Sequence, residues 1–345
     1  MPELDLPPRI DAARLPTPIE RLSRLEERHP GHEIWIKRDD LTGSLLSGNK
    51  VRKLEFTFAR ALSHGVDGVI TCGGFDSNHC RATTYLAARL GLETHLFLRT
   101  PDGRSPRSLR GNTLLDHLAG AEIRWITHEQ YASRQELMAE YAREADRDGR
   151  RLQVIPEGAS DEVGAFGYVK AAEEIETERR ARGLEFDHVV HAMGSGGTTA
   201  GLLAGREMLE APWRVTGVPV CDDGDYFRDR VREIRERMLP FGVPEWKKDA
   251  GFEVLEGYQG RGYGLTTPAE LEQIRELCRL EGILLDPCYT GKAFAGLVGE
   301  LNAGRLGSRT RVLFLHTGGV FANFTYGEEW NALLGETPRP EGPGR

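Results

Sequence analysis

Residues 188–201 read HVVHAMGSGGTTAG, and this stretch decides the fold class. An apolar run typical of a buried strand ends at Met193, and four glycines follow within the next eight residues. A helical pattern begins at Thr198, before the last of these glycines, Gly201. A strand that runs through a glycine-rich turn directly into a helix is the unit from which parallel α/β sheets are built.

The same alternation of strand and helix continues on both sides of this stretch. We expect strands at residues 33–37, 68–72, 94–98, 122–126, 188–193, 215–220 and 311–316. We expect helices at residues 53–64, 78–90, 112–118, 129–148, 163–182, 198–209, 225–238, 268–281 and 292–303. This order predicts an α/β protein with open parallel sheets that helices cover on both faces. Residues 335–345, rich in Pro, Gly and Glu, predict a loose end.

The overall composition limits the number of domains and the classes of partner. A chain of 345 residues exceeds the about 250–300 residues that one core usually reaches, so we expect two domains. The net charge is −8 and basic residues are interspersed with acidic ones, so no nucleic-acid partner is expected. No apolar run approaches the about 18 residues of a membrane span, so we expect no membrane partner.

The cysteines and the amino-terminal residues bear on the compartment. The five cysteines are scattered and form no C-x-x-C pair, which argues against a disulfide framework and against a zinc site. Residues 1–14 contain acids and prolines without an apolar core, which does not indicate a signal peptide. Both observations favour a cytoplasmic protein.

Ligands of parallel sheets bind beyond the carboxyl ends of the strands, so we examined those turns for unusual chemistry. The turn at 194–201 has glycines that let the backbone approach an anion, next to the positive end of a helix. The dinucleotide motif G-x-G-x-x-G fails because Thr199 stands at the third glycine, and no P-loop motif occurs in the chain. A purely structural turn remains the alternative.

A second turn, residues 47–53, reads SGNKVRK. Lysines such as Lys50 and Lys53 are ordinarily solvated surface charges. A buried lysine, by contrast, loses its charge readily and can attack an aldehyde. The pair Gly48-Asn49 suggests a backbone that is held close to a flat or bulky group.

A third turn, residues 72–79, joins a strand to a helix. Ser77 stands where a helix N-cap belongs, and capping alone would explain it. In the alternative, the free N–H groups of this helix end hold a substrate carboxylate. We expect His79 to make a local hydrogen bond, because no second His or Cys falls at metal-ligand spacing.

These three turns, in this order, resemble the fold-type-II (tryptophan synthase β-like) pyridoxal phosphate enzymes. The resemblance is greatest to the family of D-cysteine desulfhydrase and 1-aminocyclopropane-1-carboxylate (ACC) deaminase. The matching segments run along nearly the whole chain: LPTP (15–18), WIKRDD (35–40), GNKVRKLEF (48–56), SNH (77–79), GSGGTTAG (194–201), GYG (262–264), LDPCYTGK (285–292) and HTGG (316–319).

The resemblance implies a role for each matching residue. Lys50 matches the Schiff-base lysine and Lys53 a nearby cation, while Asn78 matches the residue that bonds the cofactor's 3-hydroxyl. The implied cofactor-binding residues are Lys50, Asn78, Gly194, Ser195, Gly196, Gly197, Thr198, Thr290 and Thr317. The implied substrate-binding residues are Ser77, Asn78, His79, Tyr263 and Tyr289, and the implied catalytic residues are Lys50, Ser77, Tyr263 and Tyr289. Plain packing, with the hydroxyl satisfied, would also explain the two tyrosines.

Two positions distinguish the members of the family. ACC deaminase has Glu where Thr290 stands and Leu where Thr317 stands. A hydroxyl stabilises a protonated ring nitrogen less than a carboxylate does, by about 1–2 kcal/mol. The pair therefore favours β-elimination, with D-cysteine giving pyruvate, hydrogen sulfide and ammonia and the Lys50 amine as the base for the Cα proton.

The resemblance also implies the architecture. A large cofactor domain would comprise residues 1–50 and 162–345, and a smaller α/β domain, residues 51–161, would close over the substrate. Homodimers are usual in this family.

Some residues depart from the family pattern and leave other substrates open. Ser47 replaces a glycine, Ala82 replaces a glutamine, Phe75-Asp76 is more polar than usual, and residues 318–323 are bulkier. These changes are compatible with ACC deamination, with sulfite release from L-cysteate, or with serine deamination. Two other classes also remain: an NAD(P)-dependent oxidoreductase that binds the ribose through Asp222 or Asp223, and an inactive homologue that only binds ligand.

Overall fold

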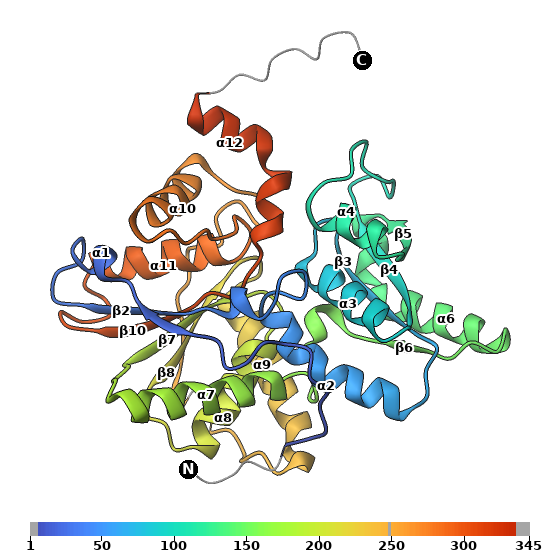
Figure 1. The fold of residues 1–345 in the computed structure, drawn as a ribbon, viewed down its shortest axis with the longest axis horizontal. Coiled ribbons are helices and arrows are strands. Elements are labelled where there is room, and N and C mark those ends of the chain that lie inside the picture. Colours follow the sequence, from blue (N-terminus) through green and yellow to red (C-terminus); the bar gives the residue numbers. More distant parts are fainter. Residues whose placement is uncertain (1–5, 248–249, 336–345) are drawn as a thin grey trace.

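The structure, a computed structural model, describes residues 6–247 and 250–335 (Figure 1). Of the expected loose end at 335–345, only Gly335 is among the described residues, and residues 1–5 of the amino-terminal segment also lie outside them. The strands are β1 (Ile19–Arg21), β2 (Glu33–Lys37), β3 (Gly68–Gly74), β4 (Glu93–Arg99), β5 (Glu122–Ile126), β6 (Leu152–Val154), β7 (His188–Met193), β8 (Arg214–Pro219), β9 (Phe252–Val254) and β10 (Arg311–Leu315).

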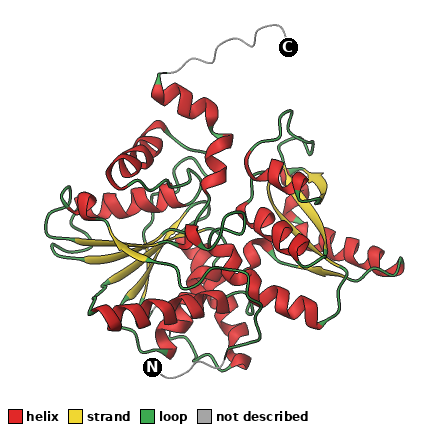
Figure 2. Ribbon diagram, viewed as in Figure 1, coloured by secondary structure: helices red, strands yellow, loops and turns green. Residues whose placement is uncertain are grey.

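The helices cover these strands from both sides (Figure 2). They are α1 (Ser23–Glu26), α2 (Asn49–Ser63), α3 (Asn78–Arg89), α4 (Gly111–Leu118), α5 (His128–Ala132), α6 (Arg134–Arg147), α7 (Phe166–Arg182), α8 (Gly197–Met208), α9 (Gly224–Met238), α10 (Pro268–Glu281), α11 (Thr290–Asn302) and α12 (Gly327–Leu334). Short 3-10 turns are η1 (Asp39–Leu41), η2 (Glu157–Ala159), η3 (Leu239–Phe241) and η4 (Val320–Thr325).

The strands form two separate sheets, as the α/β pattern predicts. The larger sheet has the order β1-β2-β10-β7-β8-β9, and the smaller has the order β5-β4-β3-β6. All neighbours pair in parallel except the edge strand β1, which pairs antiparallel with β2. We call residues 68–154, from β3 to β6, the small-sheet segment. The proposed division into residues 51–161 and the remainder stays a prediction, and its first boundary falls within α2.

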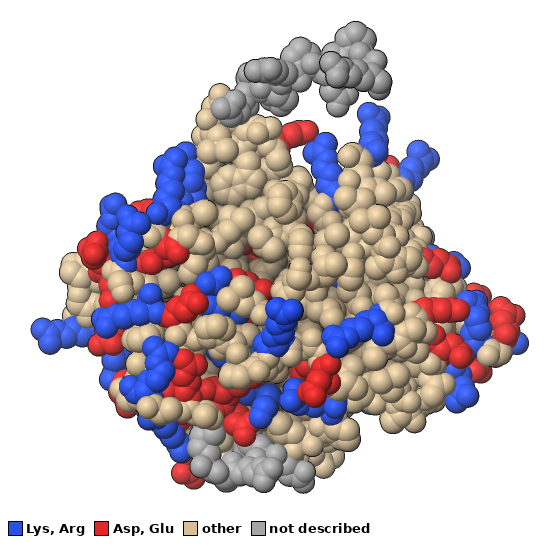
Figure 3. All heavy atoms as spheres, viewed as in Figure 1, with Lys and Arg blue, Asp and Glu red and all other residues tan. Residues whose placement is uncertain are grey.

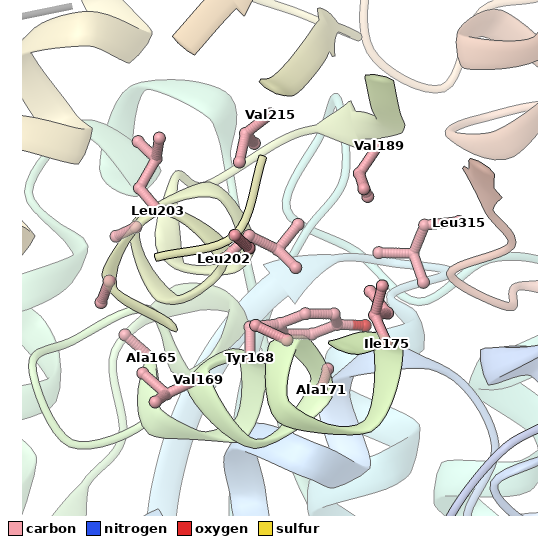
Figure 4. Close-up of a cluster of buried hydrophobic side chains, with 14 of the residues drawn as sticks. Ala165, Tyr168, Val169, Ala171, Ile175, Val189, Leu202, Leu203, Val215 and Leu315 are labelled. Atoms are coloured by element: carbon pink, nitrogen blue, oxygen red, sulfur yellow. The ribbon is translucent and has the colours of Figure 1, made fainter. Parts of the chain in front are cut away.

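The larger sheet has a separate apolar core on each face. Helices α7 and α8 pack on one face, where Ile175, Leu202 and Leu203 meet Val189 and Leu315 of the strands (Figure 4). Helices α10 and α11 pack on the other face over a second cluster of buried side chains. Burial of both faces explains why β7 and β10 contain consecutive apolar residues, such as Val189-Val190 and residues 312–315, rather than alternating ones.

The small sheet follows the two-residue period of a strand. Along β3, Val69 faces the cluster that includes α2 and α3, whereas Ile70 and Cys72 face α5 and α6. Among the described residues, no helix is both long and apolar enough to cross a membrane. Acidic and basic side chains are interspersed over the face of the molecule shown in Figure 3.

The expected elements are present, with three kinds of difference. Strands β1, β6 and β9 were not predicted, because each has only three residues, which are too few for a periodic pattern. Helix α12 was also not predicted. The expected helix at 129–148 is two helices, because the chain bends at Ser133. Helix α2 begins at Asn49, four residues before the expected start, so Lys50 lies in its first turn.

Candidate active site

A pocket lies beyond the carboxyl ends of the strands of the larger sheet, and the space free of atoms in it and at its open mouth is about 410 Å³. It is lined by Asn49, Lys50, Asn78, Ala192, Met193, Gly194, Ser195, Gly196, Thr198, Thr199, Tyr289, Thr317 and Gly318. The structure therefore brings together residues from all three turns that sequence analysis identified. Ser77, His79, Gly197, Tyr263 and Thr290 do not line this pocket.

A close contact between two stretches of backbone positions Lys50. Gly48 precedes α2 with φ at +95°, and a Cβ at this position would lie 2.7 Å from the carbonyl oxygen of Thr317. The amide of Asn49 donates to that same carbonyl oxygen over 3.0 Å. Only glycine combines this backbone conformation with this approach, so the Gly48-Asn49 pair brings Lys50 beside Thr317.

A buried ion pair holds the first turns of α2 from behind. The Arg52 guanidinium donates to both carboxylate oxygens of Asp39, at 2.8 and 2.9 Å, and forms a second pair with Glu174 at 2.9 Å. Burial acts to raise the pKa of Asp39, but Arg52 keeps that pKa below its usual range. The WIKRDD and GNKVRKLEF motifs therefore meet in the interior, where this pair fixes the helix that carries Lys50.

The Lys50 amine has a low pKa and few partners. Its Nζ donates to Asn49 Oδ1 over 3.2 Å and lies 5.8 Å from the centre of the Tyr289 ring. Burial lowers the pKa of Lys50 to about 8, against the opposing effect of Glu157, Asp286 and Cys288. An amine with this pKa is partly neutral near neutral pH, which a nucleophile or a base requires.

The glycine turn leaves donors unused at the start of α8. Gly196 has φ at +83°, and α8 begins at the next residue without a side-chain cap. Within the described residues, the N–H groups of Gly197, Thr198 and Thr199 donate no hydrogen bond. Such free N–H groups at the positive end of a helix make an anion site, and Thr198 and Thr199 line the pocket.

A chain of hydrogen bonds connects this turn with Lys53. The Lys53 Nζ donates to Ser160 Oγ over 2.9 Å, and Ser160 Oγ lies 2.8 Å from Ser195 Oγ. Lys53 is fully buried, and burial together with the charge of Lys50 lowers its pKa well below the usual range. Burial and the charge of Lys50 therefore favour a neutral Lys53, whereas the family resemblance implies a cation at this position. Ser160 was not predicted from the sequence, which marks it only as a small polar residue after the short, half-buried strand β6.

In the serine turn, Ser77 caps helix α3 and Asn78 lines the pocket. Ser77 Oγ accepts a 3.2 Å hydrogen bond from the Cys80 amide, which is the capping role. Asn78 lines the pocket, and its Oδ1 accepts from Asn112 Nδ2 over 3.0 Å. His79 is buried, with Nε2 2.8 Å from Thr71 Oγ1, and burial lowers its pKa well below the usual range. Asn78 is therefore the member of this turn that can contact a ligand in the pocket.

A second pocket adjoins the first, with about 1360 Å³ of space free of atoms in it and at its open mouth, and Asn78 and Tyr289 line both pockets. Tyr263 lines the second pocket, and its hydroxyl lies 2.8 Å from the hydroxyl of Tyr289. Burial raises the pKa of both phenols well above the usual range. The two hydroxyls therefore stay protonated and can hold or exchange a proton between them.

A buried carboxylate lies behind Thr290, and sequence analysis did not assign it a role. The Asp286 carboxylate accepts from the amides of Cys288, Tyr289 and Thr290 and from the Thr290 hydroxyl, at 2.7 to 3.0 Å. Thr290 is fully buried, whereas Thr317 faces the pocket. Of the two expected uncharged hydroxyls, that of Thr290 is therefore hydrogen-bonded to a carboxylate. In the sequence, the Asp286-Pro287 step before a helix is the feature that could have indicated this carboxylate.

Asn49 is a further residue that sequence analysis named without a contact role. Its Nδ2 donates to Thr198 Oγ1 over 3.2 Å, while its Oδ1 accepts from Lys50. One amide side chain thereby joins the lysine turn to the glycine turn across the pocket. No spacing rule connects residues that lie this far apart in the sequence, so this contact needed the structure.

Comparisons with known proteins agree on one family. The family model described as "Pyridoxal-phosphate dependent enzyme" matches residues 10–318. The bifunctional D-cysteine desulfhydrase/1-aminocyclopropane-1-carboxylate deaminase of Arabidopsis thaliana is 38% identical, over 96% of this chain and 86% of that protein. The D-cysteine desulfhydrase of Yersinia enterocolitica is 40% identical, over 92% and 96%. The crystal structure of an ACC deaminase homologue has a TM-score of 0.85 at 37% identity and covers 95% of this chain and 97% of that one.

Proposed function

Because this chain belongs to the family of pyridoxal-phosphate dependent enzymes, we propose that it is a lyase that eliminates the thiol of D-cysteine and releases pyruvate, hydrogen sulfide and ammonia. The names of the Yersinia and Arabidopsis relatives support this substrate. The observation that carries the proposal is the Lys50 amine, whose pKa is about 8 and which opens into a pocket with free amides at its other side.

The residues of the pocket fit pyridoxal phosphate. The N–H groups of Gly197, Thr198 and Thr199, without acceptors among the described residues, suit a phosphate at the start of α8. The partly neutral Lys50 amine suits an aldehyde. When bound, the cofactor supplies an aldehyde that joins amino groups and a ring that accepts the electrons left by Cα deprotonation.

We assign the proton transfers to Lys50 and the tyrosine pair. Lys50 is the base for the Cα proton, because its low pKa keeps a share of the amine neutral at physiological pH. Tyr263 and Tyr289 are joined by a 2.8 Å hydrogen bond at the junction of the two pockets, and their raised pKa values keep both phenols protonated, so either can donate a proton to a leaving group. Asn78 and the start of α3 bind the substrate carboxylate in this scheme.

The contact between Thr290 and Asp286 favours ACC deamination as a second activity. Two uncharged hydroxyls at Thr290 and Thr317 favour β-elimination, because they stabilise a protonated ring nitrogen weakly. The Asp286 carboxylate accepts a hydrogen bond from the Thr290 hydroxyl, which polarises the O–H bond, so the Thr290 oxygen carries more negative charge than an isolated hydroxyl. The Arabidopsis relative has both activities in its name.

A keto-acid and sulfide assay tests the proposed function. D-cysteine, L-cysteine, L-cysteate, D-serine and ACC are each incubated with the cofactor-loaded protein, its Lys50→Ala variant, and a Lys170→Ala control outside both pockets. We expect D-cysteine to give pyruvate and sulfide in equal amounts, with loss in Lys50→Ala only. A protein that binds the cofactor but forms no keto acid from any of the five would contradict the proposal and support an inactive homologue.

We also propose that the protein acts in the cytoplasm as a homodimer. The five cysteines are all unpaired in the structure, which supports a reducing compartment. The dimer rests on the family resemblance, and light scattering of the purified protein, at one or two times the mass of the 345-residue chain, tests it.

A further inference from the structure

Arg99 and Gly74 lie side by side at the carboxyl edge of the small sheet. They form the last pair in the parallel register of β3 and β4. Both approach Tyr263, which belongs to the loop between β9 and α10. The Arg99 guanidinium lies 5.0 Å from the centre of the Tyr263 ring, and a Cβ at Gly74 would lie 3.1 Å from its Cε1. Two residues of the small-sheet segment therefore contact Tyr263, which borders the second pocket.

The Arg99 guanidinium is fixed by stacking but is not neutralised. It lies between two rings, 4.4 Å from the centre of Tyr131 and 5.0 Å from that of Tyr263. Within the described part of the chain it has no ion pair and no hydrogen bond. Arg134 also lies over the Tyr131 ring, 4.7 Å from its centre, but it forms an ion pair with Glu157 at 3.4 Å. Arg99 thus keeps its charge and its N–H donors available to the pocket it lines.

The other charges of the second pocket do not cancel this one. Arg261 also lines the pocket and has no ion pair among the described residues. The Asp76 carboxyl is occupied by the Asn112 amide and the Thr325 hydroxyl, at 2.7 and 2.9 Å, and burial raises its pKa to about 7. Glu329 is exposed. The positive charge of Arg99 beside Tyr263 is therefore not paired with a carboxylate of the pocket.

The side chain of a substrate would extend toward this charge. Under the proposed function, Lys50 reaches Cα and Asn78 reaches the α-carboxylate, so the β-substituent lies toward Tyr289 and the second pocket. When the Cβ–S bond breaks, sulfur leaves with the bonding electron pair. The Cα proton passes to Lys50, and the electrons it leaves form the new carbon–carbon double bond. Negative charge therefore accumulates on the sulfur near Arg99.

We infer that Arg99 is a specificity-determining residue that selects amino acids whose β-substituent carries negative charge, such as a thiolate or a sulfonate, over neutral ones of similar size. This inference rests on the proposed function for the placement of the substrate. Packing against the rings of Tyr131 and Tyr263 would not by itself require a charged side chain at position 99, whereas selection of a charged substituent does.

The first test compares substrates in the cofactor-loaded enzyme. In Arg99→Gln we expect kcat/KM to fall about 10- to 100-fold for D-cysteine and for cysteate, the range for one hydrogen bond to a charged group. β-Chloroalanine carries a neutral substituent until its chloride leaves, so we expect its KM to change less than about threefold, whereas the KM for cysteate should rise; Arg99→Lys should restore part of the loss. An equal rise in KM for charged and neutral substrates would overturn the inference.

A matched control separates stacking from selectivity. Arg124 stacks on Tyr141 at 4.2 Å on the adjacent strand β5, outside both pockets. Arg124→Gln removes a comparable contact, so it should leave the substrate ratio unchanged. A change in that ratio equal to that of Arg99→Gln would mean that any stacked arginine of this sheet has the same effect, against the inference.

A binding measurement separates failure of the inference from failure of the proposed function. Calorimetry on the cofactor-loaded protein compares succinate, which has a second carboxylate, with butyrate, which has none. We expect the wild type to prefer succinate about 10-fold and Arg99→Gln to lose the preference. A preference that is absent, or unchanged in the variant, overturns the role of Arg99 even if none of the five amino acids is a substrate.

Discussion

The hydroxyl of Thr290 donates a 2.7 Å hydrogen bond to the Asp286 carboxylate and accepts a 2.8 Å hydrogen bond from the Asp286 amide. Its single proton is therefore committed, and toward other partners the oxygen can only accept. A cationic N–H would suit that oxygen better than a second acceptor. The carboxylate thus sets the direction of the hydroxyl at the start of α11.

Asp286→Asn should destabilise the protein. The carboxylate receives four donors, whereas an amide has one acceptor oxygen and brings two donors of its own. We expect the free energy of unfolding in urea to fall by about 2–3 kcal/mol, the cost of unsatisfied buried donors. Thr290→Val, which removes one hydroxyl, should cost about 1 kcal/mol. Equal stability of Asp286→Asn and the wild type would show that this carboxylate does not organise the turn.

Uptake of pyridoxal phosphate by the cofactor-free protein should report the pKa of Lys50. Only the neutral amine attacks the aldehyde, so the rate should rise with pH and reach half its maximum near pH 8. The charge of Asp286 raises the pKa of Lys50, so Asp286→Asn should move the midpoint to lower pH. Stopped-flow absorbance over pH 6–10 measures this. A midpoint near the ordinary lysine value of 10.5 would contradict the effect of burial.

Gly48→Ala should disrupt the position of Lys50. Its Cβ would lie 2.7 Å from the Thr317 carbonyl oxygen, in a backbone conformation with φ at +95°. Gly91→Ala is the matched control, because Gly91 has φ at +71° but nothing within 4 Å of the added Cβ. We expect the control to lose about 1 kcal/mol from conformation alone and Gly48→Ala to lose more, together with cofactor binding. Similar losses in both would remove the steric argument.

The Asp76 carboxyl should make stability depend on pH. Its pKa is raised by burial from 3.8 to about 7, so the folded state holds a proton that the unfolded state releases between those values. Stability therefore falls as pH rises through that window, by at most about 4 kcal/mol. Asp76→Asn cannot ionise, so the wild type should lose stability relative to it between pH 4 and pH 8.

The control for this prediction is Asp11→Asn, because the Asp11 side chain is 91% exposed. Urea unfolding at pH 5 and pH 8 compares the three proteins. A difference between wild type and Asp76→Asn that stays constant with pH would contradict the raised pKa.

The strand-turn-helix pattern was sufficient to predict parallel sheets and the three turns of the site. A helix such as α10 repeats buried apolar residues at Leu271, Ile274 and Leu277, and the strand β10 has four consecutive apolar residues, so their positions follow from the hydrophobic pattern. The three-residue strands β1, β6 and β9 carry no such pattern. They exist because a neighbouring strand offers hydrogen bonds, which is tertiary information.

The contacts of the site were less accessible from the sequence. The unusual turns drew attention to the segments that contain Lys50 and Asn78, the family resemblance assigned both residues a role, and the structure brings both to one pocket. The capping role of Ser77 and the burial of Thr290 were not distinguishable from ligand contacts by residue type. The role of Asp286 depends on its contact with Thr290, and the role of Arg99 depends on the lack of an ion pair among the described residues. Only the structure shows either of these.

Reduction with borohydride and peptide mapping is the most direct test of the role of Lys50. The cofactor-loaded protein is reduced, digested and analysed by mass spectrometry, beside Lys50→Ala and a sample reduced without cofactor. We predict a pyridoxyl group on Lys50, none on the buried neighbour Lys53, and no labelled peptide from Lys50→Ala. A label on another lysine of the wild type, or full labelling of the Lys50→Ala protein, would contradict the assignment of this pocket.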